Sequence, residues 1–228
     1  FLVLFCIKIL KKIKKILIII QRANGDVLLS HSLINSLNNY YVAPQIDLLV
    51  NDDTLALARL LPNINLIHTF SYKKKRDERW MQEKKLFKKI YRRYDLSINL
   101  TASDRSVVYS LLAAKKSISA IEEKPQKSWW KKLLLSHYYY FDTSKHILVN
   151  NLKALSLLNI KQEVNYNFPD ISNEVTHKVK NLLTSKEINE FIIFHPSAQY
   201  KFKVYPKHLR DQLLADLNSL NIPIVVSG

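Results

Sequence analysis

Residues 15–37 read KILIIIQRANGDVLLSHSLINSL, and this stretch decides the fold class of the chain. Residues 16–20 are five consecutive apolar residues, four of them β-branched, which is typical of a strand buried on both faces. A mostly polar segment follows, and apolar residues then recur at roughly helical spacing over 27–37. A buried strand that passes through a short loop into an amphipathic helix indicates a parallel α/β sheet.

The loop between this strand and helix contains Gly25 and Asp26. The chain has two glycines in 228 residues, far below the average usage of about 7%, so a glycine here needs a specific reason. It permits positive φ, or it lets another molecule approach the backbone closely. Asp26 has two interpretations: an N-cap that stabilises the helix by about 1 kcal/mol, or a general base at the edge of the sheet where ligands bind.

The rest of the chain continues the alternation of strands and helices. We expect strands at 45–50, 64–70, 96–100 and 117–121, while residues 128–142 fit either a helix or a strand. The pattern then starts again, with strands at 191–194 and 222–226. The fold class is therefore α/β, and the predicted parts are an N-terminal extension (1–13), a Rossmann-like domain with a largely parallel sheet (14–165), and a linker with the beginning of a second such domain (166–228).

Composition restricts the possible sites and partners. The single cysteine, Cys6, excludes an intrachain disulfide and a cysteine-based metal site, and it favours a reducing compartment. The histidines show no metal-ligand spacing, so we expect no metal. The net charge of +16 indicates anionic partners: nucleic acid, anionic lipid headgroups or phosphorylated small molecules.

The N-terminal segment is apolar over residues 1–7 and then rich in lysine, which is the reverse of the order in a signal peptide. Its apolar run is also much shorter than the ~20 residues that span a bilayer. We expect either a short basic interfacial helix over 2–13 or an irregular extension before the first strand. Because the first residue is Phe1 and the single methionine is Met81, we expect the sequence to be incomplete at its start.

A strongly basic stretch covers residues 72–94, which contain eleven Lys or Arg and three acidic residues. Its apolar residues Trp80, Phe87, Ile90 and Tyr91 are candidates for burial. Three interpretations are open: a solvated helix face, a contact surface for a phosphorylated glycan or anionic headgroups, and a surface on which bases stack. No recognised nucleic-acid motif accompanies the stretch, so we expect no nucleic-acid partner.

Two segments in the same order as in a known family carry more specific information. QRANGDVLL (21–29) follows the first buried strand, and FIIFHPSAQYKFKVYPKHL (191–209) combines a strand, a His-Pro loop, a lysine and an aromatic-Pro pair that opens a helix. Together they resemble the ADP-heptose:lipopolysaccharide heptosyltransferases of glycosyltransferase family 9. In that family Gly-Asp precedes the first helix, and a pattern like H-P-G-A-x-x-x-x-K-x-W-P opens the second domain. The pattern fits His195 to Pro206, with Lys203 at its lysine.

The resemblance implies a GT-B fold, in which two Rossmann-like domains face one another across a cleft. It implies an inverting transfer of heptose from ADP-heptose, a nucleotide sugar, to the inner core of lipopolysaccharide, with no cofactor. Asp26 would be the base that deprotonates the acceptor hydroxyl. The implied substrate-binding residues are Asn24, Gly25, Ser197, Gln199 and Lys203. The enzyme would be cytoplasmic and peripheral, at the anionic inner face of the cytoplasmic membrane.

The sequence departs from the family pattern at three positions of the second segment. Ser197 stands where glycine is usual, Gln199 where a serine or threonine often contacts phosphate, and Tyr205 in place of the common tryptophan. The sequence also ends before the family's acidic nucleotide-binding residue and its Asp-x-Gly-x-x-His loop, so we expect the second domain to be truncated. The alternative function is a non-catalytic fragment that retains weak binding of an anionic glycolipid.

Overall fold

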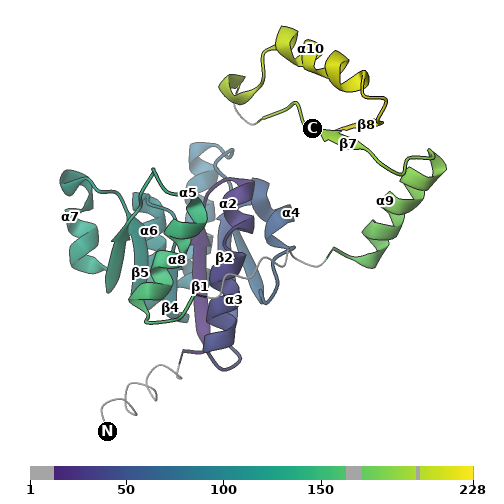
Figure 1. Ribbon diagram of the computed structural model, residues 1–228. Helices are drawn as coiled ribbons and strands as arrows, with labels where there is room; N and C mark the ends of the chain where they lie inside the picture. The colour runs from purple at the N-terminus through teal and green to yellow at the C-terminus, as the bar shows by residue number, and fades with distance from the viewer. Residues whose placement is uncertain (1–12, 163–170, 199–200, 228) are drawn as a thin grey trace. The chain divides into compact units, whose positions relative to one another are not determined.

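The structure is a computed structural model that describes residues 13–162, 171–198 and 201–227 (Figure 1). Its contacts divide the chain into two compact units, Phe1–Asp170 and Ile171–Gly228. The N-terminal extension predicted over 1–13 lies outside the described residues except for Ile13, which is buried. Within the described ranges, no helix is both long enough and apolar enough to cross a bilayer.

In the described part of the first unit, six strands form one parallel sheet in the order β3-β2-β1-β4-β5-β6. This is the order of a doubly wound Rossmann-like domain, in which the winding reverses between β1 and β4. The strands are β1 (Lys15–Ile20), β2 (Gln45–Asn51), β3 (Leu66–Phe70), β4 (Tyr94–Asn99), β5 (Ala114–Ile121) and β6 (His137–Tyr140). The helical segments are α2 (Asn24–Leu28), α3 (His31–Tyr40), η1 (Asp52–Thr54), α4 (Leu55–Ala58), α5 (Arg76–Ile90), α6 (Asp104–Ala113), α7 (Pro125–Leu134) and α8 (Ile147–Leu157).

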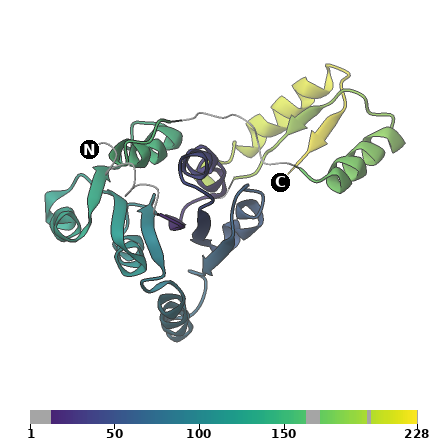
Figure 2. The same ribbon diagram turned by 90° about the horizontal axis from the view of Figure 1, so that it is seen from below.

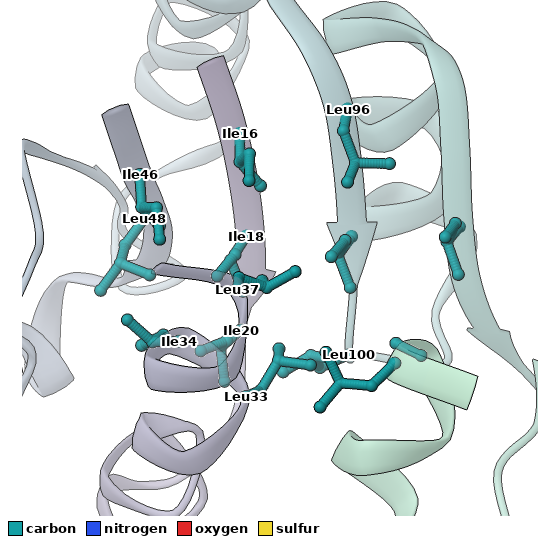
Figure 3. Packing of buried hydrophobic residues seen from close by; sticks show 14 of the residues in the cluster. Ile16, Ile18, Ile20, Leu33, Ile34, Leu37, Ile46, Leu48, Leu96 and Leu100 are labelled. Carbon is teal, nitrogen blue, oxygen red and sulfur yellow. The ribbon is translucent and has the colours of Figure 1, made fainter. Parts of the chain in front are cut away.

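Helices cover both faces of the sheet, which explains why β1 is apolar throughout (Figure 2). Ile16, Ile18 and Ile20 point to the face that carries α3 and α8, where they pack in one cluster with side chains such as Leu33 of α3 (Figure 3). Leu17 and Ile19 point to the opposite face, in a cluster with residues of α5 and α6. All five are 0% exposed, and burial of each contributes about 1.5–3 kcal/mol.

Two expectations about the helices are wrong in detail. The amphipathic segment after the first loop is two helices, α2 and α3, rather than one. In α5, Ile90 is buried and Phe87 is half-buried as expected, but Trp80 is 65% exposed, and Tyr91, directly after the helix, is 59% exposed. Helix α5 turns Leu86 and Ile90 to the sheet. Trp80 is six residues before Leu86, which at ~100° per residue places it well away from that face.

The second unit contains α9 (Asn173–Ser185), β7 (Ile192–Phe194), η2 (Lys201–Lys203), α10 (Lys207–Asn218) and β8 (Ile224–Val226). Strands β7 and β8 pair in parallel, with Ile192 opposite Ile224. The second start of the strand–helix pattern is therefore confirmed, at the predicted places. No described residue of this unit is buried, in contrast to the first unit.

Candidate active site

The loop after β1 lies at the carboxyl edge of the sheet, beside the loop after β4. The backbone N–H of Gln21 donates to Oγ1 of Thr101 over 2.9 Å, and the N–H of Leu100 donates to the carbonyl of Ile19 over 2.9 Å. Because β1 and β4 are neighbours at the point where the strand order reverses, this is the topological switch point of the sheet. In open α/β sheets, ligands bind at that point.

Asp26 is the third residue of α2, in its first turn. The N-cap is Ala23, whose methyl side chain offers no acceptor, so the N-cap interpretation of Asp26 is wrong. The Asp26 carboxylate instead accepts a hydrogen bond through Oδ2 from Nε of Arg22, over 2.7 Å. Its side chain is 23% exposed, and its Oδ1 makes no hydrogen bond within the described residues. One oxygen is therefore anchored and the other is available.

Arg22 is held by residues from two other parts of the sheet edge. Its guanidinium carbon lies 4.7 Å from the centre of the Phe141 ring, just after β6, in cation–π geometry. Nδ2 of Asn51, at the end of β2, donates to the carbonyl of Arg22 over 3.5 Å. Sequence reasoning missed these three residues. The signal was there for Asn51, because a polar residue directly after a buried strand lies at the carboxyl edge.

Gly25 is the second residue of α2, and its φ is not positive. The expectation of positive φ is wrong because the helix begins at Asn24, one residue before the glycine. A Cβ built at Gly25 would meet no atom of the described residues within 4 Å. The backbone of Gly25 and the exposed Asn24 therefore face open space, and a close approach by a substrate at this turn stays a prediction.

Several buried polar atoms near this loop have no hydrogen-bond partner among the described residues: both amide atoms of Gln21, Oδ1 of Asn51 and the hydroxyl of Tyr139. Burial raises the pKa of the Tyr139 hydroxyl, and the charge of Arg22 partly offsets this effect. An unpaired buried polar group costs about 1–3 kcal/mol of stability. Polar groups retained at that cost deserve an explanation other than stability.

The chemistry available at the loop is proton transfer and charge-assisted hydrogen bonding. The charged partner of Asp26 is Arg22, so the negative charge of the carboxylate is balanced by an ion pair and does not call for a metal cation. Within the described ranges, no group of three or more His, Cys, Asp or Glu side chains is placed to hold a metal ion.

In the second unit, the segment after β7 carries the predicted donor-side residues. Nδ1 of His195 lies 3.0 Å from Oγ of Ser227, which follows β8, and Nε2 of His195 lies 3.4 Å from Oγ of Ser197. Lys203 ends η2, with its Nζ 5.9 Å from the centre of the Phe202 ring. The structure thus brings Ser197 next to the carboxyl ends of β7 and β8, while Gln199 lies outside the described residues.

This architecture is similar to that of solved glycosyltransferases. A glycosyl transferase family 9 structure from Veillonella parvula DSM 2008 superimposes with a TM-score of 0.76 at 16% identity, over 95% of this chain and 62% of that chain. The E. coli heptosyltransferase WaaC with ADP gives a TM-score of 0.70 at 14% identity, over 94% of this chain and 66% of that chain. E. coli ADP-heptose lps heptosyltransferase II gives a TM-score of 0.67 at 20% identity, over 93% of this chain and 63% of that chain. The chain has the fold of these proteins.

The predicted α/β fold of the GT-B type is therefore confirmed, with a six-stranded Rossmann-like domain in the described residues. The chain spans 62% of the family 9 structure, 66% of WaaC and 63% of heptosyltransferase II. No family model matches the sequence. No curated protein matches it either.

Proposed function

We propose that the protein is a glycosyltransferase of the heptosyltransferase type, which transfers heptose from ADP-heptose to the inner core of lipopolysaccharide with inversion. The observation that carries the proposal is the position of Asp26: a partly exposed carboxylate, held by Arg22, at the switch point of a fold shared with family 9 glycosyltransferases. Two structures of that fold are described as heptosyltransferases, one of them with ADP.

In this mechanism Asp26 is the general base. A sugar hydroxyl is a weak nucleophile, and a carboxylate within hydrogen-bond reach takes its proton as the new bond to the anomeric carbon forms. Arg22 holds Oδ2 over 2.7 Å and so fixes the direction in which Oδ1 points. The open space at Gly25 supports an acceptor that lies against the backbone of α2, next to the exposed Asn24.

On the donor side, we assign the diphosphate to the segment after β7. As the bond from the anomeric carbon to the diphosphate breaks, negative charge builds on the departing phosphates, and a cation stabilises it. Lys203 is the residue proposed for this role, with Ser197 and Gln199 as hydrogen-bonding partners of the nucleotide sugar. The step needs no cofactor, because the base, the nucleophile and the leaving group account for every proton and bond.

We also propose that the protein works in the cytoplasm at the inner face of the cytoplasmic membrane, against an anionic surface. The support is the net charge of +16 and the exposed lysines and arginines of residues 72–94. A lipopolysaccharide acceptor presents phosphate groups, which such a surface attracts at long range. The attraction falls as salt is added, because exposed charges are screened over ~8 Å at physiological ionic strength.

The test is release of ADP from ADP-heptose by the complete protein, with a lipopolysaccharide inner-core acceptor present. Asp26→Asn keeps the shape of the side chain and removes its charge, so we expect turnover to fall about 100-fold or more, as for loss of a general base. The matched control is Asp53→Asn, which removes the exposed carboxylate of a residue in η1, the segment after β2. We expect this control to keep its turnover.

Full turnover by Asp26→Asn would exclude Asp26 as the base. Binding of the acceptor glycolipid without any ADP release, by a protein that unfolds cooperatively, would favour the non-catalytic alternative.

A further inference from the structure

A groove of about 650 Å³ lies between the edge strand β3 and the helix α5. Its walls are residues 65–69 and one face of α5, and its end is formed by the first residues of β1, β2 and β4. Lys15, which lines it, is the first residue of β1, whereas the loop of Asp26 follows the last. Five residues of strand span ~17 Å, so the groove is distinct from the candidate active site.

Five cationic side chains line this groove: Lys15, Lys74, Lys85, Lys89 and Arg93. All five are exposed, and none forms an ion pair with a residue that the structure describes. Some cations of the first unit are paired, such as Arg105 with Glu83 over 2.9 Å and Lys131 with two carboxylates. Other exposed lysines, such as Lys84 and Lys88, form no ion pair within the described residues either, so the distinguishing property of the five is that they line one groove. Five positive charges therefore line one concave site, and none of them is neutralised by an ion pair within the described residues.

The groove also contains two carboxylates, Asp47 and Glu78, and neither forms an ion pair with the five cations. Asp47 is buried, and both its oxygens are occupied: Oδ1 accepts from Nδ2 of Asn65 over 2.9 Å, and Oδ2 accepts from the hydroxyl of Tyr94 over 2.7 Å. Glu78 is exposed and makes no ion pair within the described residues. The charge of the lining side chains is therefore +5 against −2, with His68 neutral.

His68 forms part of the wall and is poised to report on charge in the groove. Its Nε2 lies 2.9 Å from the Tyr94 hydroxyl, whose proton goes to Asp47, so Nε2 carries a proton and donates. Burial lowers the pKa of His68. The charge of Asp47 opposes this effect, and the charges of Lys89 and Arg93 add to it. An anion bound beside these two cations would raise that pKa.

We propose that this groove binds a small molecule that carries at least two phosphate groups. Lysine ammonium groups bind phosphate as point charges, and Lys85 and Lys89 are one helical turn apart, ~6 Å along the axis, so that two neighbouring phosphates can each meet one ammonium. The volume falls within the range of about 300–1,000 Å³ that is typical of small-molecule sites. A concave site suits such a ligand better than the flat surface of a bilayer does.

The probe is inorganic tripolyphosphate, titrated calorimetrically into the complete protein at physiological ionic strength. The groove variant is Lys85→Gln with Lys89→Gln. The matched control is Lys84→Gln with Lys88→Gln, which removes the same charge at the same spacing from exposed positions of α5 outside the groove. We expect the groove variant to bind about tenfold more weakly or worse, and the control to change by less than about threefold, because screening over ~8 Å limits non-specific attraction.

A second readout separates a site from general charge. We follow the pKa of His68 by NMR of its ring nitrogens, at a tripolyphosphate concentration that just saturates the wild-type protein. We expect this concentration to raise the pKa in the wild-type protein and in the control, and to raise it much less in the groove variant, whose site is then mostly empty. Equal weakening in both variants, an unchanged His68 pKa on binding, or binding to anionic lipid vesicles with none to tripolyphosphate would each overturn the proposal. None of the groove residues belongs to the candidate active site, so the proposal is independent of the role proposed for Asp26. Lys74, Lys85, Lys89 and Arg93 also belong to the basic stretch 72–94, and the vesicle measurement separates a phosphate site from contact with an anionic surface.

Discussion

Asp26, in the first turn of α2, forms an ion pair with Arg22, four residues earlier in the loop after β1, and the pair orients the carboxylate. The two side chains are 23% and 30% exposed, so water screens their attraction and the pair contributes ~1 kcal/mol of stability or less. The pair nevertheless holds one carboxylate oxygen in place beside the open backbone of Gly25. A base must be positioned before its pKa matters, so this geometry is the property that a transferase would need.

Gly25→Ala tests whether a substrate lies against this backbone. The added methyl group meets open space among the described residues, and alanine favours a helix by up to ~1 kcal/mol over glycine. We expect an unchanged or higher melting temperature, together with a loss of transfer of about tenfold, or ~1.4 kcal/mol in the barrier. Thermal unfolding and initial rates measure the two effects. An unchanged rate would mean that the acceptor does not approach Gly25.

At the scale of elements, the buried strands of the sheet were predictable, because short continuous apolar runs such as residues 16–20 are typical of strands that are buried on both faces. Residues 128–142 were not, since their runs of leucine and aromatic residues fit either a helix or a strand. The structure divides them into α7 and β6, and β6 exists through its pairing with β5, with Ile118 opposite His137. Such pairing is a tertiary contact that local sequence does not contain.

Lys131 fixes α7 to the carboxyl edge of the sheet. Its side chain is 0% exposed, and its Nζ lies 2.7 Å from Oδ1 of Asp104 and 2.6 Å from Oε2 of Glu122. Burial lowers the pKa of Lys131, but the hydrogen bonds and charges of the two carboxylates outweigh it and raise the pKa. Lys131→Met should lower the free energy of unfolding by about 1–3 kcal/mol, less than for a fully buried pair because both carboxylates reach water.

Urea unfolding measures this loss, with Lys127→Met as the control at an exposed position of the same helix. A loss equal to that of the control would mean that the ion pairs of Lys131 do not anchor α7.

His68 makes the edge of the sheet sensitive to pH. Burial lowers its pKa below the ordinary value of about 6.5, so at mildly acidic pH the unfolded chain binds a proton that the folded chain does not. The stability due to neutral His68 is therefore present above about pH 6.5 and is lost as pH falls through the folded pKa. His68→Gln does not titrate, and its deficit relative to the wild type should shrink between about pH 7.5 and about pH 5.

Urea unfolding across this range gives the deficit at each pH. A deficit that grows as pH falls would show that folded His68 prefers the charged form, contrary to its buried position beside Lys89 and Arg93.

For the whole molecule, the sequence predicts where the candidate base lies but not what surrounds it. The buried strand before Gly25 and the resemblance to family 9 locate Asp26. The neighbours Phe141 and Thr101 come from the ends of β6 and β4, and their positions follow from a strand order that no local pattern specifies. The groove beside β3 could not be predicted from the sequence for the same reason. The basic stretch 72–94 supplies only some of its cations, and Lys15 joins them through the fold.

The proposed transfer of a sugar from a nucleotide donor can be measured by mass spectrometry of a lipopolysaccharide inner-core acceptor after incubation with the complete protein and ADP-heptose. We predict acceptor heavier by one heptosyl residue, and NMR of the purified product should show the anomeric configuration inverted relative to the donor. Asp26→Asn should form this product about 100-fold more slowly or worse. An unmodified acceptor in the presence of folded wild-type protein, or a product with retained configuration, would contradict the account.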